Sequence, residues 1–101
     1  IIVEHKPVLL AVRLTPGVIN KIFNNKPGHF PDKKKYRFKL VDLANDHSKY
    51  LGKDKNGNEW NAQTEPDGTQ TWVCYRDGII CDGGFYDSPI PWNEESGLIK
   101  D

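Results

Sequence analysis

The sequence predicts an α+β fold in which N-terminal helices pack on one face of a four-stranded antiparallel meander sheet. The first half carries helical patterns, with apolar residues three and four positions apart. The second half is divided at near-regular spacing by three turn signals, which are Asn56-Gly57, Pro66-Asp67-Gly68 and Asp77-Gly78. Asn-Gly and Asp-Gly supply the positive φ of tight hairpin turns, so the segments between them are expected to be strands that pair in order.

Length and charge limit the possibilities. The 101 residues suffice for one domain, 1–101, with a modest core. Fourteen basic and fourteen acidic residues cancel, so the net charge gives no argument for a nucleic acid or membrane partner. No apolar stretch approaches the roughly 20 residues of a membrane helix. Because the chain has no methionine and no signal peptide, we expect a processed product or a domain cut from a larger protein.

The first helix is expected to begin at Thr15-Pro16, with Thr as the N-cap and Pro at the first helical position. Asn24 and Asn25 are expected to end it. Its apolar face is formed by Val18, Ile19, Ile22 and Phe23. For residues 1–14, strand and helix both stay open.

A second helix is expected over residues 32–45, with Asp32 as its cap. Its buried stripe is formed by Tyr36, Leu40, Leu43 and Ala44. Asp46 is expected to cap one further short turn, 47–50, which Gly52 stops.

Four strands are expected, over residues 51–55, 58–64, 69–76 and 79–85. The tail after Phe85 contains two prolines and a glycine, and it is expected to be irregular. Trp92 is expected to pack back on the body of the domain.

The register between the second and third strands decides which side chains share a face, because side chains alternate with period two. A four-residue loop, 65–68, pairs Thr64 with Thr69, and we prefer it because it gives the cleaner amphipathic sheet. It leaves open a polar face that carries Asn61, Gln63, Gln70, Trp72, Cys74 and Arg76. The alternative, a three-residue loop ending in a glycine bulge, groups Trp60 and Ala62 with Trp72 and Cys74.

The two cysteines are expected to face each other across the last hairpin. If Asp77-Gly78 is a two-residue loop, Arg76 pairs with Ile79, and Cys74 lies directly opposite Cys81. Cysteines that face each other in this way leave two interpretations open, a disulfide formed at an oxidising stage or two adjacent buried thiols. A metal site is not expected, since two thiols without CxxC spacing and without nearby paired histidines fall short of four ligands.

Several residue types suit the recognition and cleavage of RNA. The guanidinium of Arg76 can fork onto phosphate oxygens, and the indole of Trp72 can stack on a base. His29 lies in a proline-bracketed loop, and an imidazole suits general acid or base work near neutral pH. A basic cluster lies within residues 26–39, and it is either an anion-binding patch or a solvated helix face. It consists of Lys26, Lys33, Lys34, Lys35, Arg37 and Lys39.

Motifs for other chemistries are absent from the sequence. It contains no GxSxG, no HExxH, no phosphate-binding loop and no dinucleotide fingerprint. These absences count against serine and zinc hydrolases and against nucleotide-dependent enzymes.

Three runs, KPGHFPD (26–32), ANDHSKYLGKDKNGNEW (44–60) and PDGTQTWVCYRDGIICDGG (66–84), resemble a C-terminal toxin module of bacterial polymorphic toxins. This module occurs in contact-dependent growth inhibition (CdiA-like) proteins, and the resemblance covers about residues 17 to 98. Such toxins are cut from secreted or surface-displayed carriers and act in the cytoplasm of a target bacterium. A cognate immunity protein neutralises each of them. Many are small RNases of the barnase/EndoU/colicin/RelE grouping, with helices packed on an antiparallel sheet.

The resemblance implies a metal-independent endoribonuclease that acts on tRNA. His29 is the expected general acid or base, Arg76 is expected to stabilise phosphate charge, and Arg37 is expected to assist. The expected substrate-binding residues are Lys26, Lys33, Lys35, Asn61, Gln63 and Trp72. No cofactor or metal is expected, and the need for a host activator stays open. Two alternatives also stay open, a metal-dependent DNase toxin and a non-enzymatic binding module of a large surface protein.

Overall fold

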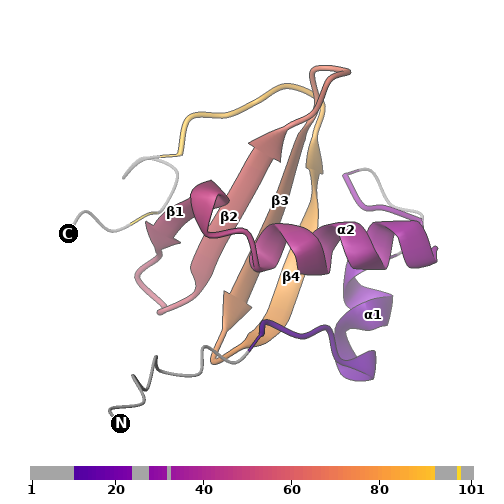
Figure 1. The fold of residues 1–101 in the computed structure, drawn as a ribbon, viewed down its shortest axis with the longest axis vertical. Helices are drawn as coiled ribbons and strands as arrows, with labels where there is room; N and C mark the ends of the chain where they lie inside the picture. Colours follow the sequence, from indigo (N-terminus) through magenta and orange to yellow (C-terminus); the bar gives the residue numbers. More distant parts are fainter. Residues whose placement is uncertain (1–10, 24–27, 32, 93–97, 99–101) are drawn as a thin grey trace, which may run out of the picture.

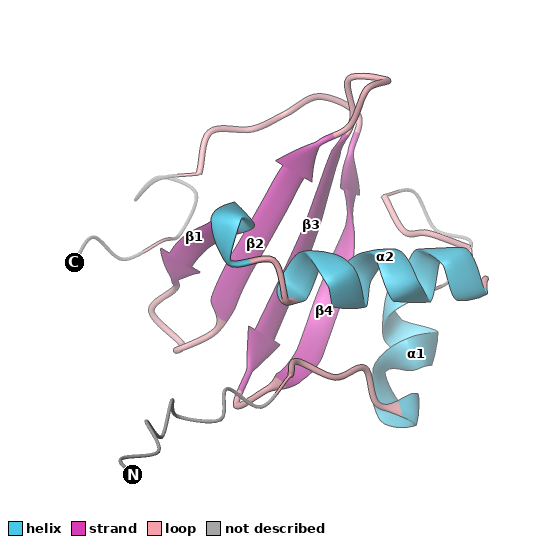
Figure 2. Cartoon of the chain, in the orientation of Figure 1, coloured by secondary structure: helices cyan, strands magenta, loops and turns pink. Residues whose placement is uncertain are grey.

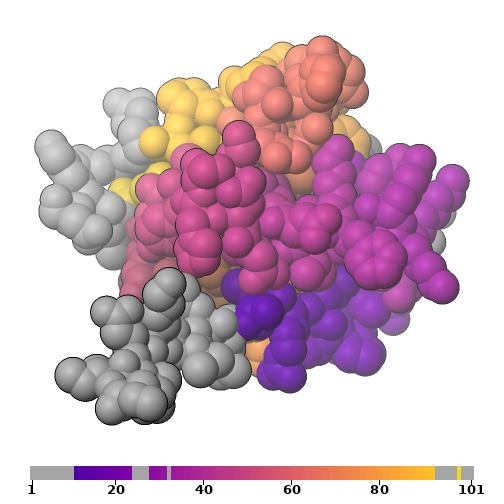
Figure 3. Space-filling model, viewed as in Figure 1, coloured from indigo at the N-terminus to yellow at the C-terminus, as the bar shows by residue number. Residues whose placement is uncertain are grey.

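The computed structural model describes residues 11–23, 28–31, 33–92 and 98. Its elements are α1 (Pro16–Ile22), α2 (Lys34–Ala44), the short 3-10 helix η1 (His47–Lys49), β1 (Tyr50–Lys53), β2 (Glu59–Thr64), β3 (Gln70–Arg76) and β4 (Ile79–Tyr86). The strands form one antiparallel sheet in the order β1-β2-β3-β4 (Figure 1). Helix α2 crosses one face of this sheet and covers it in the space-filling view (Figure 3), and α1 lies beside β4 (Figure 2). The predicted α+β meander is confirmed.

The helices begin close to the expected residues. Thr15 is the N-cap of α1 and Pro16 is its first residue, as the sequence indicates. The N-cap of α2 is Lys33, and the expected cap Asp32 lies outside the described residues. Asp46 caps η1 as predicted, because its side chain accepts a hydrogen bond from the backbone N–H of Ser48 at 3.0 Å.

The core lies between the helices and the sheet. Val73, Tyr75 and Ile80 supply its sheet side. The helices and the connecting loop supply Ile22, Phe23, Phe30, Leu40, Leu43 and Ala44. Burial of a large aliphatic or aromatic side chain contributes about 1.5–3 kcal/mol, so this layer is the main source of stability. Among the residues that the structure describes, no helix has the length and apolar character needed to cross a membrane.

The preferred register between the second and third strands is wrong. Thr64 pairs with Gln70 and not with Thr69. The backbone N–H of Glu65 donates to the carbonyl of Thr69 at 2.7 Å, which closes a loop of three residues, 66–68. Gly68 has φ +89° at the end of this loop. The alternative register, with a three-residue loop and a glycine bulge, is therefore the observed one.

This slip of one residue exchanges the two faces of the sheet. Trp60 lies opposite Cys74, and Ala62 lies opposite Trp72. The side chains of Asn61, Gln63, Thr71, Val73 and Tyr75 therefore share the face that the helices cover. The prediction of an open polar face that carries Asn61 and Gln63 is therefore wrong.

The other two hairpins differ in loop length. The N–H of Asp54 donates to the carbonyl of Asn58 at 2.9 Å, so the first turn is a three-residue loop, 55–57. The last turn is the predicted two-residue loop, since Asp77 has φ +52° and Gly78 has φ +78°.

A register shift between Cys74 and Tyr75 corrects the expected cysteine pairing. Tyr75 pairs with Ile80, but Cys74 pairs with Asp82, and Cys81 is the extra residue of a bulge. The prediction that Cys81 lies directly opposite Cys74 in the ladder is therefore wrong.

The face away from the helices carries an aromatic cluster, formed by Trp60, Trp72, Tyr86 and Trp92. The ring of Trp60 lies 5.2 Å from Trp72 and 5.3 Å from Trp92, measured between centroids. The side chain of Gln70 binds the tail by accepting from the N–H of Ile90 at 3.1 Å and donating to its carbonyl at 3.4 Å. The expected packing of Trp92 against the body is confirmed, and the tail covers a surface that the sequence suggested was open.

The segment before α1 attaches to the start of β4. Arg13 forms a parallel bridge with Ile79, the only bridge of this kind among the described residues. The side chain of Asn45 holds the neighbouring Val12, accepting from its N–H at 2.8 Å and donating to its carbonyl at 3.1 Å.

Candidate functional site

The loop that carries His29 is fixed against the end of β4. Gly28 accepts a backbone hydrogen bond from Phe85 at 3.0 Å, and its φ of +81° suits glycine. Phe30 anchors the loop, since its ring stacks on Tyr36 with centroids 4.8 Å apart and contacts Phe85 at 5.0 Å. The loop therefore holds His29 in one place through the packing of Phe30 and through the backbone hydrogen bond to β4.

The imidazole of His29 is oriented by the end of α1. Its Nδ1 lies 3.0 Å from the carbonyl oxygen of Ile22. A carbonyl oxygen can only accept, so Nδ1 carries the proton in this contact. Nε2 is then the nitrogen that can exchange a proton with a ligand.

His29 lines a groove of about 520 Å³ between its loop, α2 and the β2–β3 hairpin. We call it the His29 groove. Its polar side chains are His29, Tyr36, Lys39, Glu65, Asp67, Thr69 and Thr71. Phe30 and Phe85 add apolar wall. The groove therefore brings an imidazole, a carboxylate, an ammonium group and hydroxyls together, which are the groups that proton transfer and phosphate binding need.

Glu65 is held by three partners in this groove. Its Oε1 accepts hydrogen bonds from Gln63 Nε2 at 2.8 Å and Thr71 Oγ1 at 2.8 Å, and it lies 3.2 Å from Lys39 Nζ. Burial alone would raise the pKa of the Glu65 carboxyl, but these three partners outweigh burial and lower that pKa. Glu65 is therefore ionised at neutral pH.

A second hollow, of about 360 Å³, lies on the other side of His29. It is lined by Gly28, His29, Trp72, Phe85, Tyr86 and Asp87. The rings of Trp72 and Tyr86 are close to parallel there, with 24° between their planes. Two residues predicted for the site, His29 and Trp72, thus border the same hollow.

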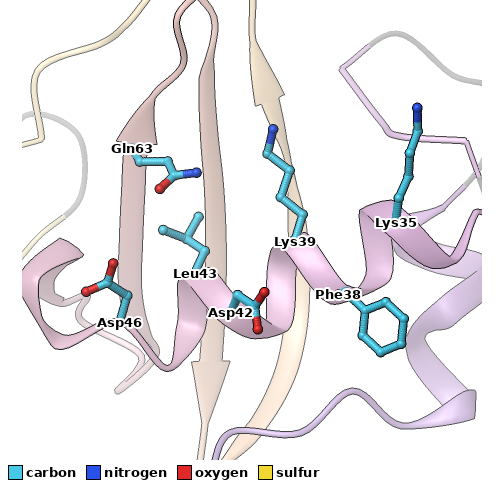
Figure 4. Close-up of a pocket in the computed structure, with 7 residues that line it drawn as sticks. All are labelled: Lys35, Phe38, Lys39, Asp42, Leu43, Asp46 and Gln63. Carbon is cyan, nitrogen blue, oxygen red and sulfur yellow. The ribbon is translucent and has the colours of Figure 1, made fainter.

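A third hollow, of about 340 Å³, lies along α2 and reaches β2 (Figure 4). Lys39 lines both this hollow and the His29 groove. Lys35 and Lys39 extend in the same direction from α2, because residues four apart share a helix face. The predicted binding residues Lys35 and Gln63 therefore lie beside Lys39. Asp42 on α2 and Asp46 just beyond its end offset the positive charge.

Arg76 is far from this site. Thr71, in the His29 groove, pairs with Phe85, whereas Arg76 pairs with Ile79 at the opposite end of the hairpin. Five residue steps of β3 separate these two pairs, or roughly 17 Å in an extended strand. The Arg76 side chain is 60% exposed, and its Nε lies 4.0 Å from Asp77. The structure does not bring His29 and Arg76 together, because the His29 loop docks at the other end of β4.

The remaining predicted residues are dispersed. Asn61 is buried beneath α2, where only protein groups reach it. Lys33 and Arg37 lie at the start of α2 and line none of these three hollows. Lys26 lies outside the described residues. In the described ranges, no three His, Cys, Asp or Glu side chains gather in a way that could hold a metal ion.

No relative decides the function. Comparisons with protein-family models, with curated proteins and with solved structures find no match to this chain. The functional interpretation therefore depends on the His29 groove. Sequence reasoning missed its residues Glu65 and Thr71, and the signal that could have found them was the alternative register, in which Gln63 lies opposite Thr71.

The contact between Gly84 and the His29 loop gives a stability prediction. A Cβ at position 84 would lie 2.5 Å from the carbonyl oxygen of Gly28 and 3.3 Å from the Trp72 ring. We expect Gly84→Ala to lower the free energy of unfolding by about 2 kcal/mol, as overpacking does. Chemical denaturation measures this. Gly17→Ala is the control, since nothing lies within 4 Å of that Cβ and alanine favours a helix. Equal stability of the two variants would contradict the close contact.

Proposed function

We propose that this chain is a metal-independent endoribonuclease toxin domain whose active site is the His29 groove. One observation carries the proposal. His29, held through Nδ1 and able to transfer a proton at Nε2, shares a single groove with an ionised Glu65 and with Lys39. Cleavage of RNA without a metal needs an acid, a base and a cation at the phosphate, and this groove has one of each.

The roles follow from the protonation of each group. All three bonds to Glu65 go to Oε1, which leaves Oε2 to take the proton of the ribose 2′-hydroxyl. The 2′-oxygen forms a bond to phosphorus while the bond from phosphorus to the 5′-oxygen breaks. Protonated His29 gives its Nε2 proton to that 5′-oxygen, while its Nδ1–H donates to the carbonyl of Ile22 and orients the ring. The products are a 2′,3′-cyclic phosphate and a 5′-hydroxyl.

Lys39 stabilises the charge that develops on the phosphate. Its Nζ is positioned by Glu65 at 3.2 Å, so the cation lies beside the base that begins the reaction. This assignment places on Lys39 the role that the sequence suggested for Arg76.

The two flanking hollows give room for the nucleotides on either side of the cleaved bond. The hollow with Trp72 and Tyr86 offers aromatic surface to a base, and base–aromatic stacking is worth about 1–3 kcal/mol. The hollow along α2 offers the ammonium of Lys35 to the next phosphate.

The proposal includes tRNA as the substrate and a cognate immunity protein as the partner, on the strength of the sequence resemblance. It also includes release from a larger secreted or surface protein and action in the cytoplasm of a target bacterium.

The test is incubation of the purified chain with total bacterial RNA in excess EDTA. We expect discrete RNA fragments with 2′,3′-cyclic phosphate ends, in equal yield with and without EDTA, because the groove supplies acid, base and cation from side chains. Cleavage of DNA that depends on a divalent ion would indicate the DNase alternative. If both RNA and DNA stay intact, the chain is a binding module, and the proposal is wrong.

A further inference from the structure

The thiols of Cys74 and Cys81 lie side by side on neighbouring strands. Their Sγ atoms are 3.2 Å apart, and both cysteines are free. The bulge between β3 and β4 produces this contact, because Cys81 is the extra residue next to Asp82, the ladder partner of Cys74. A disulfide needs the sulfurs at about 2.05 Å, so the two atoms have to approach by only about 1 Å.

The two thiols differ in access to solvent. Cys74 is 4% exposed, whereas Cys81 is only half-buried. Burial, and then the contact with Cys81, raises the pKa of the Cys74 thiol, so Cys74 stays protonated at neutral pH. An oxidant that reaches this pair from solvent meets Cys81 first, and Cys74 is positioned to react second.

We propose that Cys74 and Cys81 form a thiol–disulfide exchange site that takes small disulfide oxidants and closes to an intramolecular cross-link between β3 and β4. The thiolate of Cys81 attacks one sulfur of the oxidant, forms a mixed disulfide and expels one thiolate. Cys74 then attacks the Cys81 sulfur, its proton passes to solvent, and the second thiolate leaves. Two protein thiols are oxidised to one disulfide, and one disulfide is reduced to two thiols.

The cross-link changes stability with the redox state of the surroundings. It closes the short segment between residues 74 and 81, which removes conformational freedom from the unfolded chain. For a chain of this size, we expect the oxidised form to melt about 10 °C above the reduced form. This shift does not depend on the proposed RNase activity, because Cys74 lies on the face away from the His29 groove.

The test uses the purified 101-residue chain and an excess of oxidised glutathione. Intact-mass spectrometry should show the loss of two hydrogens with no bound glutathione, and thiol counting after denaturation should fall from two to zero. Dithiothreitol should restore both thiols and the lower melting temperature. Two free thiols after prolonged oxidation, or cross-links only between chains, would overturn the proposal. An unchanged melting temperature in the oxidised form would overturn its stabilising effect.

Two matched variants test the order of the steps. Cys74→Ser keeps the accessible thiol and lacks its partner, so it should accumulate one glutathione per chain. Cys81→Ser keeps only the buried thiol and should gain none at the same exposure. Glutathione on Cys81→Ser but not on Cys74→Ser would reverse the order of attack. The wild-type mass decides whether the site exists even if a variant does not fold.

Discussion

His29→Ala is expected to lower the rate of RNA cleavage by roughly 10³-fold, as the loss of a general acid does. In the proposed mechanism, the imidazole gives a proton to the leaving oxygen. The contact between its Nδ1 and the carbonyl of Ile22 orients the ring and leaves Nε2 available for this transfer. The measurement is kcat/KM on a fluorescent RNA oligonucleotide, with circular dichroism to confirm the fold. His29→Asn is a second variant, because its amide can still donate to Ile22 while it lacks Nε2.

Two controls separate this site from the alternatives. His47→Ala removes an exposed histidine of η1, outside the His29 groove, and should leave the rate unchanged. Arg76→Ala tests whether the geometry or the motif resemblance correctly predicts the role of Arg76. The resemblance assigns Arg76 a catalytic role, whereas the structure places it at the far end of β3, so we expect nearly full activity. Wild-type cleavage by a folded His29→Ala protein, or inactivity of a folded Arg76→Ala protein, would contradict the proposed site.

Asn61→Ala is expected to lower the free energy of unfolding by about 3 kcal/mol, because it leaves buried polar groups unpaired. Asn61 is 1% exposed, and its Nδ2 donates to the carbonyls of Leu43 at 2.8 Å and Asp46 at 3.0 Å. Its Oδ1 accepts from the hydroxyl of Tyr75 at 2.9 Å. Burial raises the pKa of Tyr75 to about 12, so this hydroxyl keeps its proton to donate. Urea denaturation measures the loss.

The sequence suggested that Asn61 binds substrate, and matched variants distinguish the two roles. Asn61→Asp has nearly the same size but turns an acceptor toward two carbonyls, so it should destabilise at least as much as Asn61→Ala. Gln63→Ala removes an amide that is only half-buried, and it should cost less than about 1 kcal/mol. Normal stability of Asn61→Ala, combined with weakened RNA binding, would favour the original interpretation.

Local signals in the sequence were sufficient for the elements of the fold. Thr15-Pro16, Asp46 and the three glycine turns each act within a few residues, and the helices and strands lie within a few residues of the expected ranges. The loop at 66–68 is the exception. The turn residues of this loop are compatible with both loop lengths. The choice between them depends on whether Asn61 or Trp60 shares the helix-covered face with Val73 and Tyr75.

The candidate site was harder to predict because its parts come from separate segments. His29 could be found from its proline-bracketed loop, but that loop docks on Phe85, more than fifty positions later. Glu65 and Thr71 enter the groove only in the correct register, and Lys39 only through the angle at which α2 crosses the sheet. Arg76 lies in the same strand as Thr71, and no local signal indicates which end of that strand the His29 loop reaches.

The aromatic cluster determines what the intrinsic fluorescence of this protein can report. All three tryptophans of the chain belong to it, with Trp60 in contact with both others at 5.2 and 5.3 Å. Indoles this close exchange excitation energy, so their emission and near-ultraviolet dichroism describe the side of the sheet where the tail lies. Detachment of the tail is visible without a label, whereas rearrangement of α2 needs an added fluorophore.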